Sequence, residues 1–242
     1  MEVCFGYNTF MDSSSHLRFA VLIAAYNEAD RIYDTVVAAA SVPGVVGVLV
    51  VDDGSRDATA DEAARAGALV VSSERNLGKG AAMERAAATL EETSPFGALD
   101  GVLLLDGDLG HSASSAGELL KPLIAGLADM SIGILPAPSG KAGFGLVLSL
   151  ARKGILEHGG GFQAKAPLSG QRALSIDCLS MVRPFASGYA MEVAMTISAL
   201  RHKQRVVEVP IEMQHRATGR NLKGFLHRGR QYYQIKRLLK SY

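Results

Sequence analysis

The chain has 242 residues, of which 48% are hydrophobic and 20% charged, a composition typical of a packed globular domain. Its net charge of +1 argues against nucleic acid as a partner, and two cysteines, Cys4 and Cys178, are too few for a disulfide framework. No basic segment followed by an apolar one opens the chain, so no signal peptide is expected. These features favour a soluble, single-domain protein of the cytoplasm.

Residues 1–17 are polar and aperiodic, which predicts a mobile leader before one domain at 18–242. After the leader, continuous apolar runs alternate with Ala-rich helical patterns. These predict strands at Phe19–Ala25, Val45–Val51, Ala68–Val71 and Val102–Leu105, and helices at Glu28–Ala40, Asp57–Ala66 and Lys79–Leu90. The alternation predicts βαβ units and therefore an α/β fold with a parallel sheet.

Ligands bind beyond the carboxyl ends of such strands, and polar residues stand there in this sequence. The first strand leads into Tyr26-Asn27-Glu28 and the second into Asp52-Asp53-Gly54-Ser55. After the third, Asn76-Leu77-Gly78-Lys79-Gly80 opens a helix, whose free N–H groups and lysine suit an anion. Each segment alone could merely cap its helix, but together they favour a ligand site at one edge of the sheet.

The fourth strand runs into two carboxylates, Asp106 and Asp108, on either side of Gly107. Side chains two apart on an extended chain point the same way, so the pair can share one target. Two adjacent carboxylates repel each other unless a cation or a proton lies between them. Oxygen ligands at this spacing suit Mg²⁺ or Mn²⁺, and such an ion suits a phosphate. The alternative is a surface turn with two solvated acids.

These motifs, in this order, resemble the family-2 glycosyltransferases of the GT-A fold, over roughly Phe19 to Arg220. The resemblance implies a single domain with a Rossmann-like, mostly parallel sheet flanked by helices. It also implies a nucleotide-sugar-binding half at 18–110 and an acceptor half at 111–220. In the first half, the residues that would meet the nucleotide sugar are Ala25, Tyr26, Glu28, Asp53, Gly78, Lys79, Asp106 and Gly107. Asp108 would ligate the metal that bridges the pyrophosphate.

The middle of the chain is less informative. Its patterns predict a helix at Ser112–Leu127, a strand at Met130–Leu135, a Gly/Pro-rich loop at Pro136–Gly145, a helix at Leu146–Leu156 and a later strand at Arg205–Ile211. The loop could be a lid over a site or a plain connector.

Three later segments, Pro167–Leu174, Phe185–Glu192 and Gln214–Arg220, are similar to one branch of the family, the glucosyl-3-phosphoglycerate synthases and their relatives. In that branch the segment ending at Glu192 shapes the sugar and acceptor site. The His of the His-Arg pair, here His215, is the second protein ligand of the metal beside Asp108. The resemblance implies acceptor-binding residues Gly170, Gln171, Arg172 and Tyr189, and catalytic residues Asp106 and Glu192.

Acceptor and stereochemistry stay open. A retaining outcome follows that branch, whereas an inverting one, with Glu192 as the base, follows most of the wider family. The branch grips an acceptor phosphate with a Gly-Arg-x-Thr turn, but the matching stretch, Gly143-Phe144-Gly145-Leu146, lacks both guanidinium and hydroxyl. Phosphoglycerate is therefore not expected unless Lys141, Arg152 or Arg172 supplies the cation. Glu192 and His215 also have plain alternatives, a helix N-terminal acid and a residue of a basic tail.

The tail, 221–242, is basic and loosely amphipathic, and the chain carries no acid after Glu212. Such a helix either docks on the domain or contacts an anionic membrane surface, which would be the inner face of the membrane. The number of subunits is open, and a homodimer is one option.

The sequence therefore predicts a metal-dependent glycosyltransferase that moves a hexose from a UDP-sugar, in preference to a GDP-sugar, to a small or lipid-linked acceptor. One alternative is a catalytically silent nucleotide-sugar sensor or scaffold. A weaker alternative is a sugar-1-phosphate nucleotidyltransferase. That chemistry needs a Gly-rich loop with Arg and Lys after the first strand, where this chain has Ala25-Tyr26-Asn27-Glu28.

Overall fold

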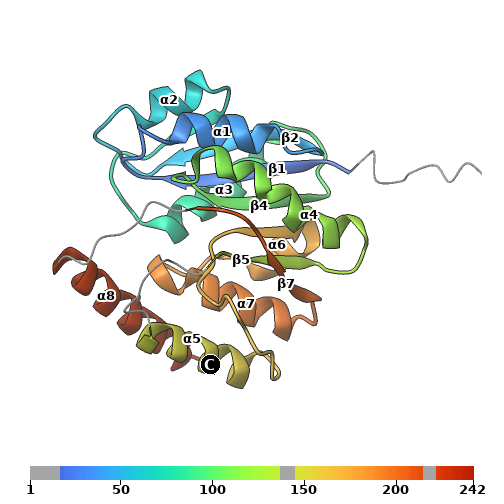
Figure 1. Cartoon of the computed structure of the whole chain (residues 1–242), viewed down its shortest axis with the longest axis vertical. Coiled ribbons are helices and arrows are strands. Elements are labelled where there is room, and N and C mark those ends of the chain that lie inside the picture. The colour runs from blue at the N-terminus through green and yellow to red at the C-terminus, as the bar shows by residue number, and fades with distance from the viewer. Residues whose placement is uncertain (1–16, 137–144, 215–221) are drawn as a thin grey trace, which may run out of the picture.

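The computed structural model describes residues 17–136, 145–214 and 222–242, except for the side chains of Tyr189 and 222–228. A seven-stranded sheet with the order β3-β2-β1-β4-β6-β5-β7 runs through it (Figure 1). The strands are β1 Phe19–Ala25, β2 Val45–Asp52, β3 Leu69–Ser72, β4 Gly101–Asp106, β5 Met130–Ile134, β6 Arg172–Ser175 and β7 Val206–Pro210. The helices are α1 Ile32–Ala40, α2 Thr59–Arg65, α3 Lys79–Thr93, α4 Gly117–Ile124, α5 Gly145–His158, α6 Ile176–Val182, α7 Met191–Arg201 and α8 Leu222–Leu239, with 3-10 turns η2 Gly110–Ala116 and η3 Gly188–Ala190.

The sheet is mixed but mostly parallel, as the alternation of strands and helices predicted. β1 pairs in parallel with both β2 and β4, β2 with β3, and β5 with β7. Only β6 runs antiparallel to its neighbours, β4 and β5. The order of the strands thus reverses at β1, because β2 lies on one side of it and β4 on the other. Open α/β sheets bind ligands at such a switch point.

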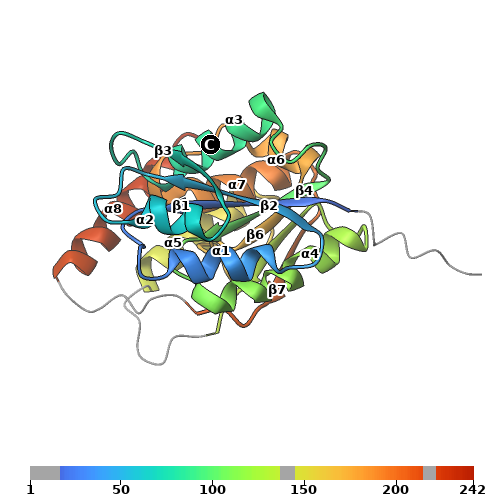
Figure 2. The same cartoon turned by 90° about the horizontal axis from the view of Figure 1, so that it is seen from above.

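Helices cover both faces of the sheet. Figure 2 shows α1 and α4 on one side and α3, α6 and α7 on the other. The alternation of side chains along β1 explains the two cores, because Val21 and Ile23 face the first layer while Ala20 and Leu22 face the second. Every residue of β4 up to Leu105 is buried, which confirms the prediction of a strand covered on both faces.

The described part of the basic tail docks on the domain. Ile235 of α8 is fully buried in a third apolar cluster, with residues of α5 and α7. At Gly154 of α5 a Cβ atom would collide with Leu239, so the two helices are in close contact there. None of the helices in the described ranges combines the length and apolar character that a bilayer-crossing segment requires.

Two predicted helices differ from the observed ones. The predicted helix at Glu28–Ala40 begins only at Ile32, after a turn in which Asn27 has φ +56°. The predicted helix at Ser112–Leu127 is a 3-10 segment followed by α4, and serine hydroxyls explain the first part. Ser112 Oγ donates to the Leu109 carbonyl at 2.7 Å, a local bond that competes with α-helical geometry.

Other predictions fall partly or wholly outside the described residues. The predicted leader lies outside except for Leu17, and most of the predicted loop at Pro136–Gly145 does too. The strand β6 and the helices α6 and α7 were not predicted as elements.

Candidate active site

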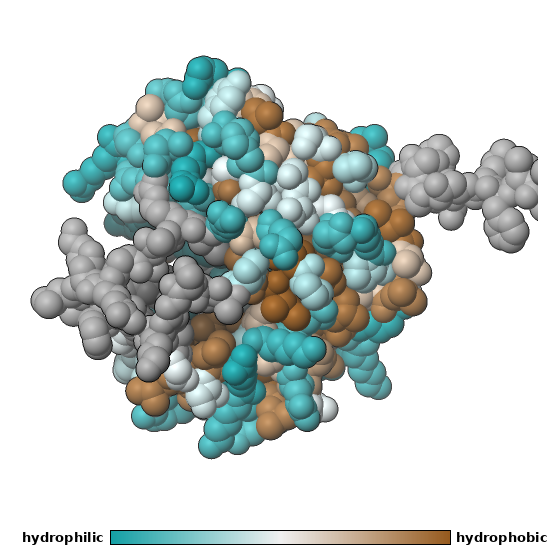
Figure 3. Space-filling model, in the orientation of Figure 1, coloured by the Kyte–Doolittle hydropathy of each residue, from teal (hydrophilic) through white to brown (hydrophobic). Residues whose placement is uncertain are grey.

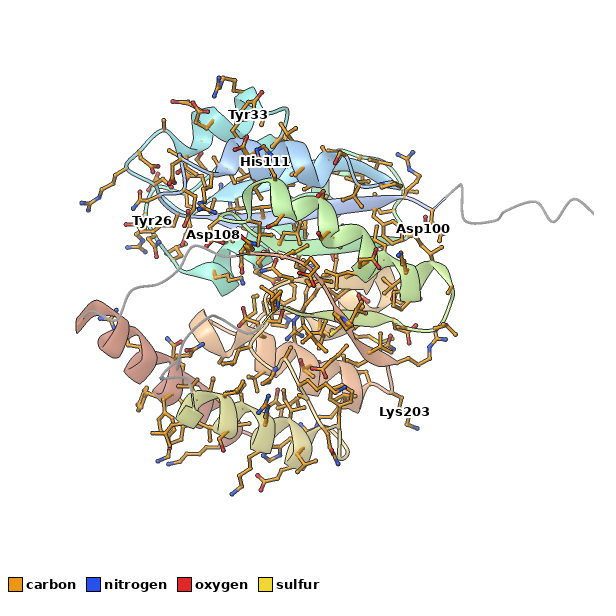
Figure 4. All side chains as sticks on the ribbon, in the orientation of Figure 1. Tyr26, Tyr33, Asp100, Asp108, His111 and Lys203 are labelled. Carbon is orange, nitrogen blue, oxygen red and sulfur yellow. The ribbon has the colours of Figure 1, made fainter. Side chains whose placement is uncertain are left out.

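Polar residues after β1, β2 and β4 lie at one edge of the sheet. Figure 4 shows Tyr26 and Asp108 on that edge and Asp100, which precedes β4, on the opposite one. The register agrees, since Ala25 pairs with Asp52 of β2 and Ala24 with Asp106 of β4. The strand ends that the sequence singled out therefore converge at the switch point of the sheet.

The tips of β1 and β2 are joined by hydrogen bonds from the backbone of one to the hydroxyls of the other. The Asn27 N–H donates to Ser55 Oγ at 2.9 Å, and the Glu28 N–H donates to Thr59 Oγ1 at 2.8 Å. Ser55 of the second motif and Thr59, the first residue of α2, thus bind the turn after β1, which helix capping alone would not require. They fix the turn that carries Tyr26 and Glu28.

Asp53 holds the loop before α3. Its side chain is buried, and its two oxygens accept the Leu77 N–H at 2.8 Å and the Gly78 N–H at 2.7 Å. The alternative in which Asp53 caps α2 is therefore wrong. The carboxylate orders the segment that delivers Lys79.

Lys79 links the two halves of the domain. Its Nζ lies 2.5 Å from Asp106 Oδ1, at the tip of β4, and 3.1 Å from Glu192 Oε1, at the start of α7. Burial alone would lower the pKa of Lys79, but the negative charges of Asp106 and Glu192 outweigh it and raise that pKa above its usual range. The lysine therefore stays charged and is shared by both carboxylates, which leaves the group of three with a net negative charge.

The segment before β6 packs on this ion pair. Gln171 Nε2 donates to Asp106 Oδ2 at 2.5 Å, and the Asp106 N–H donates to Gln171 Oε1 at 3.1 Å. A Cβ atom at Gly170 would collide with the Lys79 ammonium, so the backbone of this segment closely approaches the pair. Lys79 and Gln171 thus both engage the Asp106 carboxylate, and the target that the spacing of Asp106 and Asp108 predicted stays a prediction.

Arg172 has a different place from the one predicted. Its side chain is fully buried, and burial lowers its pKa to about 10, so it remains charged at neutral pH. Its guanidinium donates to the Ser169 carbonyl at 3.0 Å, Thr196 Oγ1 at 2.9 Å and the Glu192 carbonyl at 3.0 Å. A guanidinium with no exposed surface offers nothing to an acceptor, so the predicted contact is corrected to support of the loop and of α7.

Thr35 of α1 and Arg31, just before that helix, hold the tip of β4, and neither was predicted to belong to the site. Thr35 Oγ1 donates to the Gly107 carbonyl at 3.0 Å and accepts the Gly110 N–H at 2.8 Å. Arg31 Nη1 donates to the Asp108 carbonyl at 3.2 Å. The hint in the sequence was that Thr35 shares its helix face with apolar residues, Ile32, Val36 and Ala39, which are buried.

A cleft of about 520 Å³ opens beside these groups. Its walls come from the ends of β1 and β2, the loop before α3, the loop at Ser187–Gly188 and α8. The lining residues are Ala24, Ala25, Tyr26, Asp53, Asn76, Leu77, Gly78, Lys79, Ser187, Gly188, Arg230 and Gln234. Figure 3 shows hydrophilic residues dominating the upper-left part of one face, over α2, near this edge.

Asp108 fits one half of the predicted metal site. It is half-buried at the sheet edge, and carboxylate oxygen is the ligand type that Mg²⁺ and Mn²⁺ prefer. Within the described ranges no three His, Cys, Asp or Glu side chains are grouped to hold a metal. His215 lies outside those ranges, so the pairing of Asp108 with His215 stays a prediction. The side chain of Tyr189, predicted to bind the acceptor, is likewise not described.

Arg152 and Arg172, which could have replaced the missing phosphate-binding arginine, are both engaged by other groups of the protein. Arg152 Nε and Nη2 donate to the Ala164 and Lys165 carbonyls at 3.2 and 2.9 Å, and Arg172 is buried. Lys141, Gly143 and Phe144 lie outside the described residues. These two guanidiniums are therefore engaged by the protein and are not offered to a dianionic acceptor.

The family follows from comparison with known proteins. A family model described as glycosyl transferase family 2 matches residues 20–186. This chain belongs to glycosyl transferase family 2. The match covers the strand ends from β1 to β4 and stops before Glu192 and α8, so those two parts of the site lie outside it.

Relatives of this family-2 chain include the glycosyltransferase AglJ of Haloferax volcanii, 30% identical over 207 residues, which are 82% of this chain and 64% of that protein. The chain thus spans less than two thirds of that relative. Two crystal structures of glucosyl-3-phosphoglycerate synthase from Mycobacterium tuberculosis are also similar, each 25% identical. The one with Mn²⁺, UDP and phosphoglyceric acid has a TM-score of 0.75 and covers 94% of this chain and 79% of its own. The one with Mg²⁺ and UDP has a TM-score of 0.74 and covers 94% and 80%. The predicted GT-A fold and family are confirmed.

Proposed function

We propose that this protein transfers a hexose from a nucleoside-diphosphate sugar, with UDP as the preferred nucleotide, to a small or lipid-linked acceptor, with Mg²⁺ or Mn²⁺ as cofactor. The observation that carries the proposal is the Lys79 ammonium between Asp106 of the donor half and Glu192 of the acceptor half, beside the cleft. The UDP and metal ions bound to the two solved relatives support the choice of donor and cofactor.

The nucleoside would lie against the tips of β1 and β2. Tyr26 is 42% exposed and lines the cleft with Ala25 and Asp53, so an aromatic face is available to a base or a ribose. Glu28 stands on the same fixed turn. Asp53 acts through Leu77 and Gly78, because it orders the loop that brings Lys79 to the cleft.

Asp108, together with His215, would hold the metal. A bound divalent cation supplies Lewis-acid stabilisation of the charge that gathers on the departing diphosphate. Thr35 and Arg31 fix the backbone on either side of Asp108, and fixed ligands bind a metal more tightly than mobile ones.

Glu192 is the base in this proposal. It takes the proton of the acceptor hydroxyl as that oxygen bonds to the anomeric carbon and the bond from that carbon to the diphosphate breaks. Attack opposite the leaving group inverts the anomeric centre. Arg172 and Thr196 hold the Glu192 carbonyl, so the carboxylate starts from a rigid helix end.

The acceptor is one that needs no guanidinium grip. Arg152 and Arg172 are engaged by protein groups, which argues against phosphoglycerate. The exposed basic residues Lys236, in α8, and Lys240, just after it, would bring the protein to an anionic surface on the cytoplasmic side of a membrane, where lipid-linked acceptors lie.

The test is a screen of UDP- and GDP-hexoses for nucleotide release, with Mn²⁺ or with EDTA, in the presence of candidate acceptors. We expect Mn²⁺-dependent release of UDP that Asp108→Ala abolishes. Nucleotide binding without release from any donor would favour the sensor instead.

A further inference from the structure

The C-terminal helix forms part of the donor cleft. Arg230 and Gln234 of α8 line it together with Tyr26 and Lys79. Residues four apart lie on the same face of a helix, so α8 turns one edge toward the cleft. This helix lies beyond residue 186, where the family match ends, and no role follows for it from that match.

Packing on both sides fixes this edge of α8. Ile235 is fully buried against α5 and α7. Its burial fixes the position of Gln234, the residue before it. Gly188 has φ +66°, and a Cβ atom there would collide with the Gln234 amide. The helix therefore meets the Ser187–Gly188 loop at a contact that only glycine permits.

The charges around the cleft indicate that Lys79 alone cannot balance a bound diphosphate, so a second cation is needed. Lys79 is neutralised by Asp106 and Glu192, and Asp53 and Asp108 add further negative charge at the same edge. Among the described residues that line the cleft, Arg230 is the cation that has no carboxylate partner. A nucleoside diphosphate brings two phosphates, and a guanidinium binds phosphate oxygens in a bidentate manner.

We propose that Arg230 binds the diphosphate of the donor, so that α8 is a wall of the donor site as well as a docked tail. This inference rests on the proposed function, namely that the cleft takes a nucleoside-diphosphate sugar. Through Gln234 and Gly188, α8 also contacts the loop that faces the start of α3, which holds Arg230 at the cleft that Lys79 also lines.

The experiment is calorimetric titration of UDP, with Mn²⁺, into the full chain and two variants. Arg230→Gln removes the proposed contact. Arg237→Gln makes the same change of charge on an exposed residue of α8 that does not line the cleft, and serves as the matched control. We expect Arg230→Gln to weaken UDP binding about tenfold, as loss of a charge-assisted hydrogen bond does, and Arg237→Gln to stay within about twofold of the wild type.

Uridine separates a phosphate contact from a contact to the nucleoside. The loss in Arg230→Gln should vanish with uridine, and an equal loss would overturn the proposal because the guanidinium would then meet the base or ribose. Equal losses in the two variants, or unchanged UDP binding by Arg230→Gln, would overturn it as well. If the wild type binds neither UDP nor GDP, the proposed function fails too. Matching melting temperatures of the variants show that both fold.

Discussion

At the scale of single residues, the site depends on one lysine shared by two carboxylates. Lys79 has its pKa raised by Asp106 and Glu192, so the ammonium persists throughout the neutral range and holds the tip of β4 to the start of α7. Gln171 adds two hydrogen bonds to Asp106. Of the two carboxylates, Glu192 is the one that belongs to the acceptor half.

Glu192→Gln tests the proposed base. The amide keeps the size of the side chain but cannot accept the acceptor proton, so we expect kcat to fall at least about 100-fold while the donor affinity changes less than about threefold. Steady-state kinetics with the donor found in the screen, together with UDP titration, measure both. The control is Glu157→Gln on α5, which should leave both values unchanged. A kcat near that of the wild type would remove Glu192 from the chemistry.

At the scale of elements, the loop between α6 and α7 is held to α3 by ion pairs. Arg183 Nη2 lies 2.7 Å from Glu84 Oε1, and the Phe185 N–H donates to Glu84 Oε2 at 2.9 Å. The carbonyl of Ala186 then touches α3 so closely that a Cβ atom at Gly80 would collide with it. These contacts set the position of the Ser187–Gly188 wall of the cleft.

The Glu84 contact makes part of the stability depend on pH. Burial alone would raise the pKa of Glu84, but the hydrogen bonds from Arg183 and Phe185 outweigh it and lower that pKa. Since the folded-state pKa is depressed, this stabilisation is complete above the unfolded-state pKa, about 4.3, and is lost as pH falls through the folded-state value. Glu84→Gln should therefore cost about 1 kcal/mol in urea unfolding at pH 7, and progressively less as the pH falls from about 4.3 through the folded-state pKa. The control Glu92→Gln changes an exposed residue, and its free energy of unfolding should match that of the wild type across this pH range. A loss of stability in Glu84→Gln that stays constant with pH would contradict this explanation.

Gly80→Ala tests the approach of the loop to α3. Alanine favours a helix by up to about 1 kcal/mol over glycine, but its methyl group would meet the Ala186 carbonyl and push the loop away. We expect a net loss of about 1–3 kcal/mol in urea unfolding and weaker UDP binding. The matched control, Gly229→Ala in α8, meets open space and should be neutral or stabilising. A stabilised Gly80→Ala variant with full UDP affinity would contradict the packing described.

Elements that depend on neighbouring residues were predicted from the sequence, whereas features that depend on contacts between distant residues were not. The first four strands were predicted to within one or two residues, because short continuous apolar runs between turn residues are typical of strands. Burial on both faces explains β1 and β4, whereas β3, at the edge of the sheet, is half-buried to exposed. β6 was missed, since it has four residues and opens with Arg172, whose burial depends on Ser169, Glu192 and Thr196. The strand-end motifs predicted the position of the site, but not Thr35, whose partners lie far along the chain. The pattern of α8 predicted a docked helix and could not say that it reaches a cleft.

At the scale of the whole molecule, two halves of the chain meet at one sheet edge. β1, β2 and β4 bring there the residues proposed to bind the donor, and α7 brings Glu192 to the Lys79 ion pair. The C-terminal helix α8 lines the cleft. The central claim is that this edge binds a metal-bound diphosphate, with Asp108 as a metal ligand.

Calorimetric titration of UDP into the wild type and Asp108→Asn, each with Mn²⁺ and with EDTA, tests that claim most directly. The asparagine keeps the size of the side chain and removes its charge. We predict that Mn²⁺ strengthens UDP binding to the wild type at least about tenfold and has no such effect on Asp108→Asn. UDP binding that is equally tight in EDTA, or a Mn²⁺ effect that survives in Asp108→Asn, would contradict the account.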